Sequence, residues 1–499
     1  MVVVLALLGA VHWYVWRRLV RDVTRPGGAV RRIGAGVLVL LPLLSVGALV
    51  AGRAGAPFWL ERILAWPGYL WLALLLYLVL ALLVGEAVRP LLLRLLPAAS
   101  GAGAPPATDA PEPEAAPAAE AAAPEAPGPE APPIPVAPSG SAAPPATDAP
   151  EPEAAPAAEA AAPEAAEAVA PDARPTPPPA RPAPVRTASA GTAPDPAVGP
   201  AAGSPGAAGS ASGAGPADVP RRNGPVSRRL FVSRIVGGTA AAAAVGTVAH
   251  GAHGVLRGPR LKRITVPLAK LPRAAHGYRI AVVSDIHLGP ILGRAHTQRI
   301  VDTINGAQPD LVAVVGDLVD GSVADLGPAA EPLARLEARH GSFFVTGNHE
   351  YFSGAAQWVD HVRELGLRPL ENQRVELPGF DLAGVNDVAG ESEGQGPDFA
   401  AALGDRDRAR TAVLLAHQPI VIDEAVRHGV DLQLSGHTHG GQLWPGNYLA
   451  ELANPTVAGL ERYGDTQLYV SRGAGAWGPP VRVGAPSDIT LVQLASRQA

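Results

Sequence analysis

The chain has 499 residues, 47% of them hydrophobic and 17% charged, with a formal net charge of -5. This length allows more than one domain. The sequence contains no cysteine, which excludes disulfide bonds and thiolate metal ligands. Fifteen acidic residues and five arginines lie in residues 97–226, so this segment carries -10 and the rest of the chain +5. The overall charge therefore gives no reason to expect a nucleic acid partner.

Residues 1–96 predict a membrane anchor. The runs 1–16, 33–52 and 67–88 are almost wholly apolar, and the last two have about the 20 residues that a helix needs to cross a bilayer. We therefore expect three membrane-spanning helices here. A signal peptide is the alternative for the first run, but no small-residue cleavage site precedes the arginines that follow it.

The arginines predict how these helices are oriented. The second loop holds only Arg53 and Arg62, and the third predicted helix is followed by Arg89 and Arg94. The first loop holds six arginines: Arg17, Arg18, Arg21, Arg25, Arg31 and Arg32. Because cytoplasmic loops of membrane proteins are enriched in basic residues, we expect the first loop to be cytoplasmic.

Residues 97–226 predict a disordered linker. The segment consists mainly of Ala, Pro, Glu, Gly and Ser, and it lacks the bulky apolar side chains that build a core. Residues 104–126 recur identically as residues 143–165. The block is repeated only once and contains prolines throughout. It therefore indicates a duplication within a linker and not a structural repeat.

Residues 227–252 predict a fourth membrane helix. Its start, Ser-Arg-Arg-Leu-Phe-Val at residues 227–232, resembles a twin-arginine export signal, which makes the twin-arginine export machinery a candidate partner beside the lipid bilayer. Basic flanking of an ordinary membrane helix explains the same arginines. Both explanations predict a multi-pass membrane protein with a cytoplasmic linker and an extracytoplasmic domain at residues 264–499.

This last part of the chain predicts an α/β domain. Short runs rich in β-branched and apolar residues predict buried strands at 279–284, 311–315, 342–346, 412–415 and 432–435. Helical patterns at 294–305, 329–340 and 353–365 lie between the early strands and each stops at a glycine. Ligands of such folds gather at the carboxyl ends of the strands.

Metal-binding side chains follow each of these strands. They are Asp285, His287, Asp317, Asn348, His417, His437 and His439. Two divalent ions about 3.5 to 4 Å apart need one carboxylate that reaches both, with oxygen and nitrogen donors on either side. Asp317 is the candidate for the shared carboxylate. Such ligands admit manganese, iron or zinc, and a hydroxide between the two ions would be the nucleophile.

The motifs D-x-H, G-D-x-x-D, G-N-H-E/D, H and G-H-x-H occur in this order and resemble those of the calcineurin-like metallophosphoesterase superfamily, over about residues 275–496. Residues 414–419, 434–444 and 469–483 resemble its exported or membrane-associated bacterial branch. The resemblance implies a four-layer αββα sandwich. It also implies that Asp285, His287, Asp317 and His439 hold one ion and that Asp317, Asn348, His417 and His437 hold the other. His349 would be the catalytic acid beside the metal-bridging Asp317.

Individually, these residues have ordinary structural explanations, such as an aspartate that caps a helix or a histidine packed in the core. Five motifs in the expected order outweigh those explanations. Asp320 and Glu350 either orient a ligand histidine or face solvent. Candidate substrate contacts are Tyr351, Trp444, Trp477 and Arg472, each of which has a packing role as its alternative.

The sequence therefore predicts a membrane-anchored phosphoesterase with two divalent ions that hydrolyses phosphodiesters, with phospholipids or cell-wall polymers as candidate substrates. A phosphomonoesterase is the first alternative. The second is a non-catalytic metal-binding sensor or scaffold in the membrane. The presence of His349 together with a complete set of ligands favours an enzyme.

Overall fold

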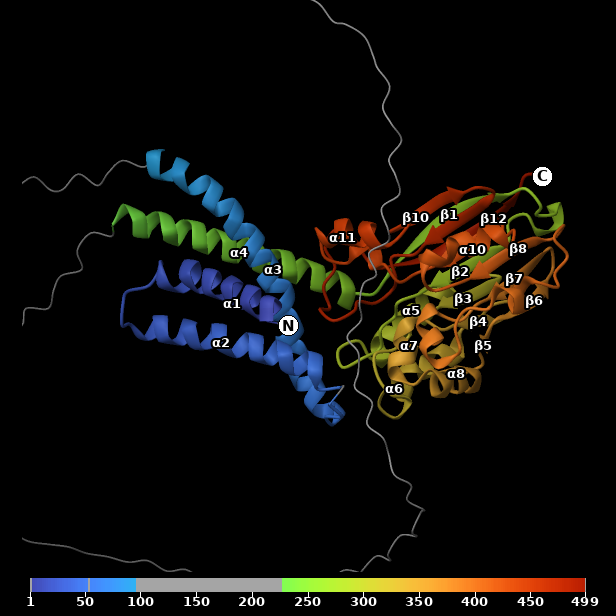
Figure 1. Cartoon of the computed structure of the whole chain (residues 1–499), viewed down its shortest axis with the longest axis horizontal. Coiled ribbons are helices and arrows are strands. Elements are labelled where there is room, and N and C mark those ends of the chain that lie inside the picture. The colour runs from blue at the N-terminus through green and yellow to red at the C-terminus, as the bar shows by residue number, and fades with distance from the viewer. Residues whose placement is uncertain (1, 53, 96–226, 499) are drawn as a thin grey trace, which may run out of the picture. The chain divides into compact units, whose positions relative to one another are not determined.

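The computed structural model describes residues 2–52, 54–95 and 227–498. The predicted linker at 97–226 lies outside the described residues. The described residues on both sides of it belong to one compact unit. They form a group of long apolar helices and a mixed α/β domain (Figure 1).

The apolar helices are α1 (Val2–Trp16), α2 (Ala29–Val50), α3 (Phe58–Leu95) and α4 (Arg228–Leu256), with a π-helical turn (Arg17–Arg21) after α1. By length and composition, α2, α3 and α4 are candidate membrane spans. Helix α1 has 15 residues, fewer than the roughly 20 that a span requires. Among the described residues, two candidate spans therefore lie before the predicted linker and one after it, and the span predicted at 1–16 stays a prediction.

Helices α2 and α3 approach each other closely at Gly68. A Cβ atom at this position would lie 2.6 Å from the carbonyl oxygen of Leu44, so only glycine allows this separation. The buried Ser45 hydroxyl donates a hydrogen bond to the carbonyl oxygen of Gly68 at 2.8 Å. Small residues and interhelical hydrogen bonds are typical of helix contacts inside membranes.

The domain contains two six-stranded sheets. In the first, the order is β1 (Arg260–Leu268), β12 (Asp488–Ser496), β2 (Arg279–Val283), β3 (Leu311–Val315), β4 (Ser342–Val345) and β5 (Arg368–Pro369). In the second, it is β10 (Gly459–Tyr463), β11 (Thr466–Val470), β9 (Leu432–Ser435), β8 (Thr411–Leu415), β7 (Phe380–Gly384) and β6 (Gln373–Leu377). The strands β2 to β5 are parallel, as are β7, β8, β9 and β11.

The side chains of β2 show how the layers pack. Ile280 and Val282 point into a core shared with β8 and β9 of the other sheet. Ala281 and Val283 point to the opposite face, where they meet Ile300 of α5 (Arg294–Ala307) and other helix residues. Alternate residues of a strand face opposite sides, so one strand supplies both cores.

Helices cover the outer face of each sheet. The first sheet is covered by α5, α6 (Val323–Ala330) and α8 (Ala355–Glu364). The second is covered by α9 (Phe399–Leu403) and α10 (Ile422–Arg427). Two further short helices, α7 (Asn348–Ser353) and α11 (Gly446–Ala453), come after β4 and β9 in the chain. This arrangement confirms the predicted four-layer αββα sandwich.

The helix predicted at 329–340 was placed wrongly. Helix α6 begins at Val323, after Ser322, whose side chain accepts a hydrogen bond from the backbone N–H of Asp325. It ends at Ala330, and a 3-10 turn follows over Glu331–Arg335. Pro332 has no backbone N–H to donate to an α-helical hydrogen bond. The α-helix that Ser322 caps therefore ends before this turn.

Candidate metal centre and active site

The predicted ligands lie at the carboxyl ends of parallel strands in both sheets. Asp285 follows β2 and Asp317 follows β3, which is its direct neighbour. His417 and His437 follow β8 and β9, which are also neighbours. Because neighbouring parallel strands end at the same edge, the topology brings these loops together.

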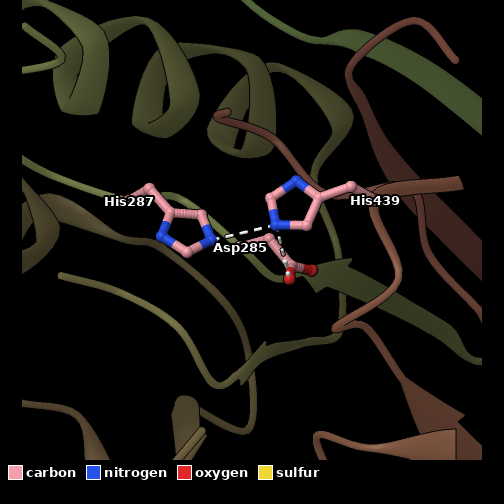
Figure 2. A group of neighbouring side chains, drawn as sticks. All are labelled: Asp285, His287 and His439. Atoms are coloured by element: carbon pink, nitrogen blue, oxygen red, sulfur yellow. Dashed lines mark hydrogen bonds and ion pairs between the residues drawn. The ribbon is translucent and has the colours of Figure 1, made fainter. Parts of the chain in front are cut away.

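One group of side chains consists of Asp285, His287 and His439. The Nε2 atoms of the two histidines are 3.0 Å apart, and Nε2 of His439 lies 3.4 Å from Oδ1 of Asp285. Figure 2 shows the two rings and the carboxylate turned toward one another. All three side chains are buried. Three ligand atoms that converge in this way suit one cation.

A second group consists of Asp317, His417 and His437. Nε2 of His417 lies 3.1 Å from Oδ2 of Asp317, and Nδ1 of His437 lies 3.1 Å from Oδ1 of Asn348. Asp317 also faces the first group, since its Oδ2 lies 3.7 Å from Nε2 of His287. The structure thus brings all seven predicted ligands together, with the Asp317 carboxylate between the two groups.

The His417 ring has the arrangement expected of a metal ligand. Its Nδ1 lies 2.9 Å from the carbonyl oxygen of Val315, which can only accept, so Nδ1 donates. Its Nε2 is buried, makes no hydrogen bond and lies 3.1 Å from Oδ2 of Asp317, the predicted shared ligand. In metal-binding histidines, one ring nitrogen usually donates a hydrogen bond to a nearby oxygen, and the other ring nitrogen binds the cation.

The backbone of the ligand loops is strained. Eight described residues other than glycine have positive φ angles, and five of them are predicted ligands. These five are Asp285, His287, Asp317, His437 and His439. The left-handed region is unfavourable for residues with a Cβ atom, and such strain concentrates at functional sites.

Two glycines of the motifs are required by close packing. A Cβ atom on Gly436 would overlap the Asp285 carboxylate. A Cβ atom on Gly347 would overlap the Asp317 carboxylate. Both glycines therefore allow the backbone of a neighbouring loop to approach a predicted ligand, in addition to any part they have in turns.

Burial and charge shift the pKa values of the centre. Burial alone lowers the pKa of His287, but Asp320 and the other carboxylates outweigh it and raise this pKa to about 9. The pKa of His417 is likewise well above its ordinary value because Asp317 outweighs burial. Burial, together with the charge of His417, lowers the pKa of His437 to about 4. Around His287 and His417, the negative charge of the carboxylates has a larger effect on the pKa than burial does. Such a negatively charged site favours bound cations.

Asp320 contacts the predicted ligand His287 and the predicted catalytic acid His349. Its Oδ1 lies 2.9 Å from Nδ1 of His287 and 2.6 Å from Nδ1 of His349. Burial raises the pKa of Asp320, but these histidines outweigh it and lower the pKa to about 2. The carboxylate is therefore charged and accepts from both rings, which fixes their orientations. This contact favours the first explanation that the sequence left open, in which Asp320 orients a histidine.

Glu350 is also directed inward. Its carboxylate is buried and accepts hydrogen bonds from the backbone N–H groups of Asp317, Leu318 and Gly347 at 3.0, 2.8 and 2.6 Å. Burial and the charge of Asp317 raise its pKa to about 7, although the backbone donors oppose this. Glu350 contacts backbone and no ligand ring, so it holds the loops after β3 and β4 together.

Arg482 is a site residue that the sequence analysis missed. It is 5% exposed, and its guanidinium lies 2.9 Å from Nδ1 of His439 and donates to the carbonyl oxygen of the same residue at 3.0 Å. It also donates to the carbonyl oxygens of Gly475 and Arg472 at 2.8 and 2.6 Å. The available signal was its position as the single charged residue in the otherwise apolar stretch 473–485.

The four candidate substrate contacts lie in different surroundings. The Trp477 ring is 5.9 Å from the His349 ring and lines a cleft of about 520 Å3 beside His349. The Tyr351 hydroxyl donates a hydrogen bond to the carbonyl oxygen of Gln395. Trp444, Arg472 and Tyr351 are not among the described residues that line this cleft. Phe352, which was not predicted, lines it.

Comparison with known proteins follows the same motifs. The calcineurin-like phosphoesterase family model matches residues 278–441. A transmembrane protein with a metallophosphoesterase domain from Danio rerio is 39% identical over 250 residues, which are 47% of this chain and 57% of that protein. A metallophosphoesterase from Helicobacter pylori (strain J99) is 38% identical over 47% of this chain and 64% of its own length.

A shorter metallophosphoesterase from Aquifex aeolicus is 35% identical over 243 residues, which are 48% of this chain and 92% of the Aquifex protein. The match to the first two relatives spans about six tenths of their length. The match to the Aquifex protein covers nearly all of it. The strands, the motif glycines and the clustered aspartates and histidines agree with these matches, and the chain belongs to the calcineurin-like metallophosphoesterase family.

Proposed function

We propose that this protein is a membrane-anchored phosphodiesterase that uses two divalent metal ions and acts outside the cytoplasm. The observation that carries the proposal is the placement of Asp317 between two groups of ligand side chains, with the His349–Asp320 pair directly beside them. Family membership supports a metal-dependent phosphoesterase. The preference for diesters, the reaction mechanism and the side of the membrane are parts of the proposal.

The two ions divide the ligands between them. Asp317 would be shared, Asp285, His287 and His439 would hold the first ion, and Asn348, His417 and His437 would hold the second. The distances among these side chains support this division. When bound, two such ions polarise a phosphoryl group and supply hydroxide at neutral pH. Manganese, iron and zinc all suit oxygen and nitrogen ligands.

The residues of the chain position and protonate the substrate. His349 donates a proton to the leaving oxygen, or stabilises the phosphoryl charge, through the ring nitrogen that Asp320 does not hold. Asp320 keeps His349 and His287 oriented. Arg482 donates to the carbonyl oxygen of His439 and so positions the loop that carries this residue. These contacts keep the reacting groups in place before the substrate binds.

The arginine distribution supports an extracytoplasmic domain, since the basic first loop is expected inside and α4 leads outward into β1. Ser227 caps the first turn of α4, and its side chain accepts a hydrogen bond from the N–H of Leu230. The twin-arginine export signal over this segment stays a prediction. Either export route places the domain on the side opposite the linker.

The test is an assay of the full chain in detergent or nanodiscs, after metal removal and reloading with manganese, iron or zinc. Bis-p-nitrophenyl phosphate and p-nitrophenyl phosphate distinguish diesterase from monoesterase activity. We expect about two ions per chain and faster turnover of the diester. Faster turnover of the monoester would contradict the proposed diesterase and indicate a phosphomonoesterase. Bound metal without turnover of either substrate would favour a sensor or scaffold.

A further inference from the structure

We propose that the cleft beside His349 binds a membrane lipid, with the lipid's phosphoester at the metal centre and one of its chains against α2 and α3. This inference rests on the proposed function and names the class of its substrate. The carrying observation is that one cleft is lined both by residues of the metal centre and by residues of two candidate membrane spans.

The cleft has a polar end at the catalytic residues. His287, Asp320 and His349 line it there. Its volume of about 520 Å3 lies within the range of sites that bind small organic molecules. A phosphate group placed at this end would meet the nitrogen of His349 that Asp320 does not hold.

The walls of the cleft carry apolar side chains from both parts of the structure, interspersed with polar ones. Ala48 and Leu49 near the end of α2 and Phe58 of α3 form one wall. Leu292 and Trp477 belong to the wall from the domain. Phe58 also packs against the hydrophobic core between the first sheet and its helices. The catalytic residues at one end and the apolar side chains on both walls suit an amphiphilic molecule.

Further contacts attach the domain to the apolar helices. The Tyr77 hydroxyl of α3 donates to the carbonyl oxygen of Trp444 at 3.0 Å. The backbone N–H of Arg482 donates to the carbonyl oxygen of Gly251 in α4 at 3.3 Å. Val481 is fully buried among side chains of α3 and α4. The residues around the metal centre are therefore held against candidate membrane spans, so a lipid can reach them without leaving the helix surface.

The length of α3 places part of the cleft at the membrane surface. Its 38 residues extend over about 57 Å at 1.5 Å per residue, compared with about 30 Å for the hydrocarbon core of a bilayer. One end of the helix can therefore project beyond the hydrocarbon while the rest spans it. Phe58 and Glu61, which line the cleft, belong to the first turns of this helix.

The charges of the cleft favour a lipid over a polyanionic cell-wall polymer. Among the described lining residues, Glu61, Asp320 and Asp325 are acidic and none is lysine or arginine. A polymer with many phosphates would meet repulsion outside the metal centre. A lipid brings one phosphodiester and an uncharged chain. Phe352 and Trp477, which are 71% and 56% exposed, add aromatic side chains of the kind enriched at membrane interfaces.

The experiment varies the chain of the substrate and leaves the reacting bond unchanged. Methyl, hexyl and dodecyl p-nitrophenyl phosphate are assayed with the full chain in nanodiscs. We expect kcat/KM to rise with chain length, by at least about tenfold from methyl to dodecyl, which corresponds to burial of about two methylene groups. Leu49→Trp should lower the dodecyl-to-methyl ratio of kcat/KM by about tenfold because the indole fills the wall.

Val46→Trp is the matched control, since Val46 lies on the same helix, is 52% exposed and does not line the cleft. It should leave both rates unchanged. Trp477→Ala tests the opposite wall and should also lower the ratio, which keeps the test valid if Leu49→Trp fails to insert. Equal kcat/KM for all three substrates, or equal ratios in the Leu49 and Val46 variants, would overturn the lipid site and leave the phosphodiesterase intact. Absence of turnover with every metal would instead contradict the proposed function.

Discussion

Nδ1 of His349 lies 2.6 Å from Oδ1 of Asp320, and the same oxygen lies 2.9 Å from Nδ1 of His287. One carboxylate thus connects the predicted catalytic acid to a predicted metal ligand. The two rings meet nearly at right angles, with their centres 4.7 Å apart. A change at Asp320 should therefore affect both metal binding and proton transfer, whereas a change at His349 should affect only the second.

Replacing His349 by alanine should leave the bound metal unchanged and lower the rate of hydrolysis. We expect kcat to fall by about 10² to 10⁴, the usual contribution of a general acid, with an unchanged metal content by elemental analysis. His276→Ala is the control, because that side chain is exposed and lies in another part of the domain. A parallel loss of metal would show that His349 is a ligand instead.

Replacing Asp317 by asparagine should abolish turnover and lower bound metal, because the amide cannot supply a charged oxygen to two ions. Metal analysis and the diester assay measure the two effects. Asp360→Asn is the matched control, since that side chain is 73% exposed. Full metal content with normal turnover in Asp317→Asn would refute the shared-ligand assignment.

Replacing Asp320 by asparagine should weaken both metal affinity and activity by about 10- to 100-fold, as expected when the partner of a ligand histidine is lost. The amide retains the size of the side chain, so the fold should persist. Metal titration of this variant beside His349→Ala separates the two roles. A loss of activity without any change in metal affinity would mean that Asp320 orients His349 and does not affect His287.

Metal binding should release protons at neutral pH. The pKa of His287 is about 9, so the ring is protonated at pH 7 in the metal-free protein and must lose a proton to bind a cation. The affinity should therefore rise with pH, by up to about tenfold per unit for each such proton, and level off above pH 9. Calorimetric titrations in two buffers of different ionisation enthalpy measure the release. Identical heats in both buffers would contradict it.

Arg482→Met should destabilise the protein by about 3 kcal/mol or more, since several buried carbonyl groups lose their donor at once. The cause is local to the metal centre, so added metal should recover part of the melting temperature. Arg427→Met, at a side chain that is 65% exposed, should change it little. Equal melting temperatures for both variants would argue against a structural role of Arg482.

Local sequence patterns were sufficient for much of the site. Asp285 and Asp317 follow short apolar runs that form β2 and β3, and the parallel pairing of these strands brings their ends together. The helix predicted at 329–340 was placed wrongly because Ser322 caps a helix that begins at Val323, and a 3-10 turn that contains Pro332 follows its end at Ala330. Helix limits depend on such small local preferences, whereas a buried strand depends on a continuous apolar run.

Other features have no local signal. The residue types of the five predicted ligands with positive φ angles do not indicate this backbone conformation. The contact of Asp320 with two histidines and the burial of Arg482 against His439 join residues that are far apart in the sequence.

The sequence by itself determined the fold class, the candidate ligands and the apolar helices, because strand patterning, motif order and hydropathy are properties of short segments. Only the tertiary structure decided how Asp320, Glu350 and Arg482 act and that one cleft combines α2, α3 and the metal centre. The physical reason is that burial, close approach and shared hydrogen bonds depend on the packing of distant segments.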